Sequence, residues 1–281
     1  MPRVARPNPK LDQTSSALRH RMTIVILGLD AVAVAVLMMT SGYRGASDLL
    51  TLVGLGDSFG LLAAAFLYLT LLISPLALVF PKLPHKQNWF LARRGLGLSS
   101  LLFALPHALV SFFGPLGGIA GIPFLDPYSG WALVLGLVAL VVLIVLGSTA
   151  WDGAVRKLGQ ARWKLLHRTV YLAAVLVLIH LMLIGTHYGD PHSPWTFWSL
   201  AAVGFLLFLE ALRFDHWWSK RFPQDRRFGP ASLLAVALIT STWFWTSSHP
   251  ETASVGAGVR WVTGHHGMVL PAPAETAEAK P

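Results

Sequence analysis

The chain contains several apolar segments, each long enough to cross a membrane as a helix. About 18 or more apolar residues span the hydrocarbon layer, which is about 30 Å thick. The predicted spans are residues 23–41, 58–80, 95–114, 129–149, 165–186, 195–213 and 230–247. A single-pass helix satisfies its own backbone hydrogen bonds in lipid, which an isolated strand cannot do. The sequence therefore predicts an all-α fold, a polytopic membrane helix bundle of about seven transmembrane helices.

Composition agrees with this class and excludes several kinds of chemistry. Of the 281 residues, 54% are hydrophobic and 12% charged, which is typical of a membrane protein. The chain has no cysteine. The absence of thiols excludes disulfides, cysteine-ligated iron–sulfur clusters, covalently attached haem and a thiol nucleophile.

The distribution of basic residues predicts the orientation in the membrane. On the seven-span map, 19 of the 22 lysines and arginines fall on the N-terminal side, and only Arg44, Arg260 and Lys280 fall on the other. The positive-inside rule puts the N-terminus in the cytoplasm, and an odd number of spans puts the C-terminus outside. We expect a multi-pass protein of the bacterial inner (plasma) membrane. Its net charge of +9 is accounted for by topology and contact with membrane lipid, so we expect no nucleic-acid partner.

The predicted organisation has five parts. They are a cytoplasmic basic arm (1–22), a first transmembrane span with an outer loop (23–57), a transmembrane core (58–213), a cytoplasmic loop with a seventh span (214–247), and a disordered outward tail (248–281). The tail contains the sequence GHHGM at Gly264–Met268, whose side chains suit copper, although an incidental polar tail is the simpler interpretation.

Two histidines, His107 and His180, lie in predicted spans that run in the same direction across the membrane. His107 follows Arg94 by thirteen residues, and His180 follows His167 by the same number, so both fall at about the same depth in the outer half. An imidazole in lipid is costly without a partner, a cavity or a cofactor. The pair predicts a haem iron ligated by His107 and His180. Hydrogen bonds to neighbouring helices are the alternative.

His167 stands at the cytoplasmic end of the same predicted span as His180. On a regular helix the two rings would lie about 20 Å apart along the axis and point about 140° away from each other, so they would not ligate one iron. His167 is flanked by Lys164 and Arg168. An interfacial role and contact with haem propionates are alternatives to iron ligation for this residue.

Three segments carry a recognisable pattern: LLISPLALVFP (71–81), ARRGLGLSSLLFALPHALVS (92–111) and GSTAWDGAVRKLGQARWKLLHRTVYLAAVLVLIHLML (147–183). They resemble the ferric-reductase-like transmembrane family over about residues 58–213, and within it the haem-binding subunits of bacterial methionine-sulfoxide reductase systems. The resemblance implies that His107, His167 and His180 are haem-associated. The wider family holds two haems with four histidines, and Arg94 stands here at the fourth place. One haem b is therefore expected, with two as the alternative.

These features predict an electron-transfer subunit of an oxidoreductase. Electrons would come from a quinol or a cytoplasmic flavoprotein reductase, because the lone G-x-G fragments at 54–56 and 95–97 lack the strand–helix context of a nucleotide site. FMN or quinone is a further candidate cofactor. By resemblance, the acceptor is a periplasmic molybdopterin enzyme that reduces methionine sulfoxide. A ferric or cupric reductase, and a haem-free transporter or assembly factor, are the alternatives.

Two acidic residues and one basic segment complete the candidate sites. Asp30 lies in the middle of the first predicted span, where it would either relay protons from a quinol or have a structural role, protonated or paired with another span. Glu210 precedes Arg213 by three residues, which predicts a local ion pair. The segment 154–167 is basic and amphipathic, and we expect it to lie along the inner membrane surface, where an electron donor could also dock.

Overall fold

The computed structural model describes residues 9–43, 49–184 and 194–221, and these residues are mainly helical. The α-helices are α1 (Pro9–Tyr43), α2 (Leu49–Val79), α3 (Lys86–Phe113), α4 (Pro127–Ser148), α5 (Asp152–Leu158), α6 (Gln160–His167), α7 (Val170–Ile184) and α8 (Pro194–Arg221). A short 3-10 helix, η1 (Gly118–Phe124), connects α3 to α4. Within these ranges there is no β-strand, in agreement with the predicted all-α class.

The described residues include five stretches that are long and apolar enough to cross a membrane. They are Ser16–Thr40, Leu52–Val79, Lys86–Phe113, Pro127–Ser148 and Gln160–Leu183. The chain is therefore a multi-pass membrane protein. The sixth predicted span corresponds to α8, which is not among the five. The seventh, 230–247, and the tail lie outside the described residues, so the number of seven spans and the positions of the two ends remain predictions.

Several helices extend beyond the apolar runs that predicted them. Helix α1 begins at Pro9 and α3 at Lys86, because lysine and arginine are good helix formers and continue a helix past the hydrocarbon layer. Helix α4 begins close to its predicted start for a local reason. The side chain of Asp126 accepts hydrogen bonds from the backbone N–H of Tyr128 (2.9 Å) and Ser129 (3.2 Å), and Pro127 occupies the first turn.

The fifth predicted span is interrupted by a two-residue turn, so the regular helix assumed for the angle between His167 and His180 does not hold over its whole length. Helix α6 ends at His167 and α7 begins at Val170. At the break, the hydroxyl of Thr169 donates to the carbonyl of Leu166 (2.8 Å), a local bond of the kind that competes with helix continuation. The basic segment is also divided, because Gly159 (φ 78°) turns the chain between α5 and α6. A left-handed φ of this kind favours glycine.

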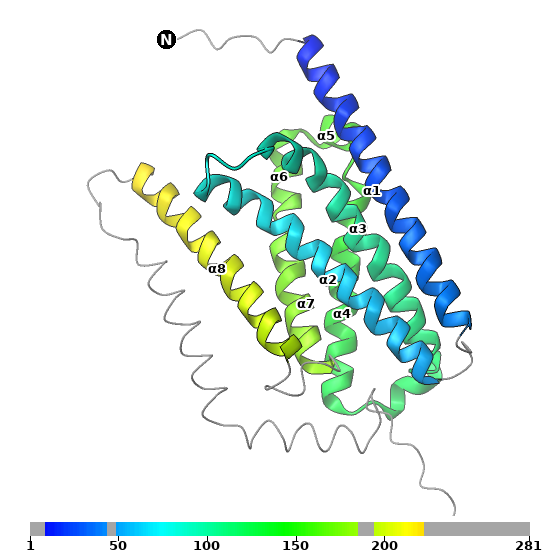
Figure 1. The fold of residues 1–281 in the computed structure, drawn as a ribbon. Helices are drawn as coiled ribbons and strands as arrows, with labels where there is room; N and C mark the ends of the chain where they lie inside the picture. Colours follow the sequence, from blue (N-terminus) through cyan, green and yellow to red (C-terminus); the bar gives the residue numbers. More distant parts are fainter. Residues whose placement is uncertain (1–8, 44–48, 185–193, 222–281) are drawn as a thin grey trace, which may run out of the picture.

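The helices pack as two principal pairs, α2 with α3 and α4 with α7. Helix α1 lies along α3 on one flank and α8 lies against α2 on the other, while α5 and α6 lie at the end where α1 begins (Figure 1). One apolar cluster contains Leu55, Phe59, Ala63 and Phe103, and a second contains Leu67, Leu71, Leu143 and Ala173. Ala104 on α3 packs against both clusters, so the two helix pairs share a continuous apolar interior.

Candidate cofactor site

The structure brings the rings of His107 and His180 together between the two helix pairs. His107 comes from α3 and His180 from α7, and their ring centroids lie 6.0 Å apart with the ring planes at 86°. A metal–imidazole bond is about 2 Å long, so two imidazoles that ligate one metal from opposite sides have centroids about 6 Å apart. The spacing of the two rings therefore suits one shared metal ion.

Each of these rings is held by a backbone carbonyl of a neighbouring helix. The Nδ1 of His107 lies 2.8 Å from the carbonyl oxygen of Gly56 on α2, and the Nδ1 of His180 lies 2.8 Å from that of Ala132 on α4. A carbonyl oxygen only accepts hydrogen bonds, so Nδ1 must carry the proton in both rings. A neutral imidazole in this tautomer keeps its lone pair on Nε2, the atom that would ligate a metal.

Both rings also lie close against glycines. A Cβ added at Gly60 would meet the Nδ1 of His107 at 2.8 Å, and one added at Gly136 would meet the Nδ1 of His180 at 2.8 Å. The rings are thus in close contact with the helix backbone, at distances that only glycine permits.

The donor set suits haem better than a bare metal ion. Within the described ranges there is no group of three or more histidines, aspartates or glutamates that could hold a metal. A haem iron has four ligands in its own macrocycle and needs only axial ligands from the protein, so two imidazoles are enough. The surroundings are apolar. Phe103, one turn before His107, is 1% exposed, and its ring stacks on that of Phe66 with centroids 5.5 Å apart. The residues present therefore fit a haem.

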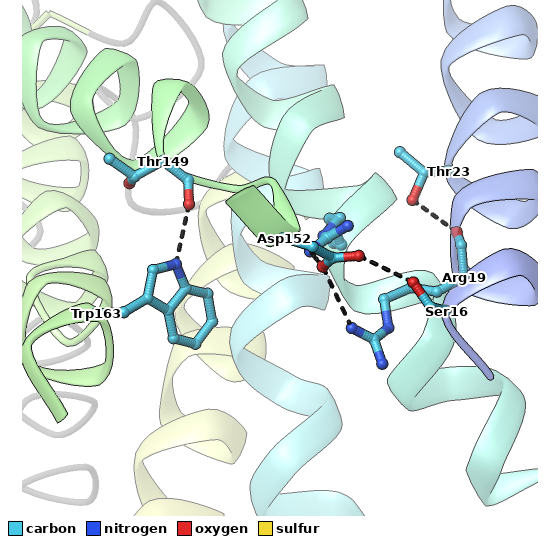
Figure 2. Close-up of polar contacts among 7 residues, drawn as sticks. Ser16, Arg19, Thr23, Thr149, Asp152 and Trp163 are labelled. Carbon is cyan, nitrogen blue, oxygen red and sulfur yellow. Dashed lines mark hydrogen bonds and ion pairs between the residues drawn. The ribbon is translucent and has the colours of Figure 1, made fainter. Parts of the chain in front are cut away.

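His167 lies in a different environment from the paired histidines. Its Nε2 is 3.2 Å from the hydroxyl of Thr149, and its ring stacks on Trp163 with centroids 4.1 Å apart. Trp163 in turn donates from Nε1 to the carbonyl of Thr149 at 2.9 Å (Figure 2). These contacts join α6 to the end of α4. They give His167 a packing role at the end of the bundle where α5 and α6 lie.

A polar cluster around Asp152 lies at the same end of the bundle. The carboxylate at the start of α5 accepts hydrogen bonds from Arg94 of α3 and from the hydroxyl of Ser16 of α1 (2.9 Å), and it lies 3.7 Å from Nη1 of Arg19. Figure 2 shows Ser16 and Arg19 reaching this carboxylate from α1. Arg94, which stands where the wider family has a histidine, is thus half of an ion pair.

Asp30 has a hydrogen-bonding partner in the membrane-spanning part of the bundle. It is 5% exposed and accepts a hydrogen bond from Ser99 of α3, which is itself fully buried. This contact provides the pairing with another span that was one of the two predicted roles.

The predicted ion pair between Glu210 and Arg213 is confirmed, with Nη1 of Arg213 at 3.3 Å from Oε1 of Glu210. Tyr171 of α7 joins it, since its hydroxyl lies 3.2 Å from both side chains. The pair therefore connects α8 to α7.

The sequence analysis did not single out Asp152, Gly60 or Gly136. Asp152 had a signal, because it stands three residues after the fourth predicted span and is the first acidic residue among the arginines and lysines of that loop. Gly60 and Gly136 carry no sequence signal that separates them from the other glycines of the chain. Glycine is frequent in transmembrane helices, and its role depends on the residue that faces it.

The comparisons with known proteins agree with the resemblance seen in the sequence. The family model of the ferric reductase like transmembrane component matches residues 59–179. The protein-methionine-sulfoxide reductase heme-binding subunit MsrQ of Salmonella enteritidis is 38% identical over 161 residues, which are 57% of this chain and 76% of that protein. MsrQ of Agrobacterium fabrum is 35% identical over 128 residues, 44% of this chain and 55% of that protein.

The chain is also similar to part of a magnetosome protein. The magnetosome protein MamZ of Magnetospirillum gryphiswaldense is 34% identical over 105 residues, 36% of this chain and 16% of that protein. The chain thus spans about half of the Agrobacterium relative and a small part of MamZ. No solved structure matches the chain.

Proposed function

Because the chain belongs to the ferric-reductase-like transmembrane family that includes the MsrQ subunits, we propose that it is a haem-binding electron-transfer subunit of a bacterial inner membrane. His107 of α3 and His180 of α7 would hold one b-type haem, which would supply its redox chemistry there. The observation that carries this proposal is the pair of rings 6.0 Å apart, each with Nδ1 hydrogen-bonded to a carbonyl. That combination leaves two Nε2 lone pairs in an apolar interior, where a buried imidazole needs a partner.

A bound haem supplies one-electron redox chemistry at this depth of the membrane. The chain supplies the ligands and their environment. The carbonyls of Gly56 and Ala132 fix the tautomer and the direction of the two imidazoles. The apolar residues around Phe103 exclude water, and a site of low polarity disfavours a gain of net charge on the iron centre.

We propose the acceptor from the names of the MsrQ relatives, and the donor from the sequence, whose G-x-G fragments lack the context of a nucleotide site. Electrons enter from a quinol or from a cytoplasmic flavin reductase and leave to a periplasmic methionine-sulfoxide reductase that carries molybdopterin. Those names support a methionine-sulfoxide reductase as the acceptor, whereas its molybdopterin rests on the family resemblance alone. We propose one haem and not two, since the fourth histidine position of the wider family holds Arg94, which is ion-paired with Asp152.

A reoxidation assay tests this function. The full chain, purified in detergent and reduced, is mixed with a molybdopterin methionine-sulfoxide reductase, and its haem spectrum is followed. We expect rapid reoxidation only when both the reductase and methionine sulfoxide are present. The matched control is His216→Ala, which removes an exposed histidine of α8 and should reoxidise like the wild type.

The same assay separates the alternatives. Reoxidation by ferric citrate at the same rate without the reductase would identify a metal reductase and contradict the proposed acceptor. A purified protein without any haem absorbance would contradict the proposed function as a whole, and would favour a transporter or an assembly factor.

A further inference from the structure

We propose that Gly60 and Gly136 are positioning residues that seat the two ligand histidines, each acting together with the backbone carbonyl four residues earlier. We call these two arrangements the α2 seat (Gly56 carbonyl and Gly60) and the α4 seat (Ala132 carbonyl and Gly136). The inference deepens the proposed function and rests on it, because it concerns how His107 and His180 are held toward the haem.

The two seats have the same construction on different helices. The Nδ1 of each histidine lies 2.8 Å from a carbonyl oxygen, that of Gly56 for His107 and that of Ala132 for His180. In an α-helix the carbonyl of residue i points toward the N–H of residue i+4. A side chain that donates to this carbonyl from outside must therefore lie beside residue i+4, and in both seats that residue is a glycine.

The space at each seat excludes a larger residue. A Cβ at Gly60 would lie 2.8 Å from Nδ1 and 3.0 Å from Cε1 of His107. A Cβ at Gly136 would lie 2.8 Å from Nδ1 and 2.9 Å from Cε1 of His180. These distances are well inside van der Waals contact. Any side chain at either position must push the ring away from its carbonyl or move the two helices apart.

The seat acts on the haem through the imidazole. A hydrogen bond from Nδ1–H fixes the tautomer and the ring direction and makes the Nε2 ligand more basic. A more basic ligand stabilises ferric over ferrous iron and so lowers the midpoint potential. Loss of a seat should therefore raise the potential, and it should weaken haem binding by about 10- to 100-fold, the usual cost of removing such a partner.

Two other glycines provide matched controls on the same helices. Gly54 on α2 and Gly130 on α4 each precede a seat glycine by six residues. A Cβ at either position would have no neighbouring atom within 4 Å. Gly54→Ala and Gly130→Ala therefore make the same change in helix propensity without touching a histidine.

The experiment compares Gly60→Ala and Gly136→Ala with these two controls, each as the full chain purified from membranes. Haem per protein, the low-spin electron paramagnetic resonance signal and the midpoint potential are measured. We expect lower haem content, a shifted low-spin signal and a more positive potential in both seat variants, and wild-type values in both controls. Seat variants with the wild-type signal and potential would overturn the inference.

A second comparison covers the case in which a seat variant folds poorly. In the His107→Ala background the ring is gone, so adding Gly60→Ala should not lower the thermal unfolding temperature, because alanine favours a helix over glycine. The same holds for Gly136→Ala in the His180→Ala background. A further loss of stability there would assign the glycines to general helix packing and overturn the inference. The wild-type protein could also contain no haem while Gly60→Ala and Gly136→Ala destabilise it only when the facing histidine is present. That result would contradict the proposed function but not the inference about the glycines.

Discussion

At the scale of single residues, Asp152 connects three helices through one carboxylate. The hydrogen bond from Arg94 is the main reason that the pKa of this carboxyl lies below its usual value near 3.8, and it outweighs the opposing effect of burial; Ser16 and Arg19 add to the lowering. The side chain is 38% exposed, so solvent screens the charges. We therefore assign the cluster no more than about 1 kcal/mol of folding free energy.

The stabilisation by Asp152 should depend on pH in a defined direction. A carboxyl whose pKa is lower in the folded chain stabilises the fold above its unfolded pKa, and this contribution is lost as the pH falls through the folded pKa. Asp152→Asn should lower the unfolding temperature of the purified protein at pH 7, by about 2–4 °C per kcal/mol lost. The gap to the wild type should close as the pH falls from 7 through the folded pKa, which lies below the ordinary value near 3.8. An equal difference in unfolding temperature between the wild type and Asp152→Asn at pH 7 and at low pH would show that the charge of Asp152 does not stabilise the fold.

The sequence locates some site residues well and others poorly, for a physical reason. His107 and His180 are conspicuous because a polar ring in an apolar run is unfavourable without a partner. Gly60 and Gly136 are not, because their importance lies in the ring that packs against them. The position of Arg94 was visible in the sequence, but its partner Asp152 depends on the short helix α5 and on the tertiary fold.

At the scale of elements, the contact between Asp30 and Ser99 ties α1 to α3. A charged carboxylate in the middle of a span costs about 2.5–3.5 kcal/mol on insertion scales, and the hydroxyl of Ser99 offsets part of this cost. The break between α6 and α7 was not predictable from hydropathy, since Arg168 and Thr169 are tolerated in a helix that enters the membrane. The hydrogen bond of Thr169 to Leu166 becomes evident only in the structure.

Substitutions of Asp30 separate its two predicted roles. Asp30→Asn keeps a polar partner for Ser99, and we expect wild-type stability and wild-type oxidation of a quinol analogue. Asp30→Leu removes the hydrogen bond, worth about 0.6 kcal/mol on average between membrane helices, together with the larger cost of a carboxylate in the span, so we expect no loss of stability. Thermal unfolding and quinol oxidation are measured on both variants. Loss of quinol oxidation in a stable, haem-loaded Asp30→Asn variant would instead support proton relay.

At the scale of the whole molecule, hydropathy predicts which segments are apolar enough to span a membrane, but not which of these helices pack against each other. Five predicted spans correspond to helical stretches that are long and apolar enough to cross a membrane. The pairing of α2 with α3 follows from a short connection, whereas the pairing of α4 with α7 across the intervening α5 and α6 does not follow from any sequence pattern. That second pairing is what brings His180 to His107.

The predicted orientation can be tested without background because the chain has no cysteine. Ile119 of η1 is 78% exposed, and Lys82 lies exposed between α2 and α3. A membrane-impermeant maleimide should label Ile119→Cys in intact spheroplasts and Lys82→Cys only after lysis. The reverse pattern would mean that the basic loops face outward, against the positive-inside rule.

The central claim is that His107 and His180 ligate one haem iron, and the low-spin electron paramagnetic resonance signal of purified single variants tests it most directly. We expect the signal in the wild type, its loss in both His107→Ala and His180→Ala, and its retention in His167→Ala, whose ring is engaged with Thr149 and Trp163. An unchanged low-spin signal in either His107→Ala or His180→Ala would contradict the pairing. Loss of about half of the haem in His167→Ala would reveal a second haem.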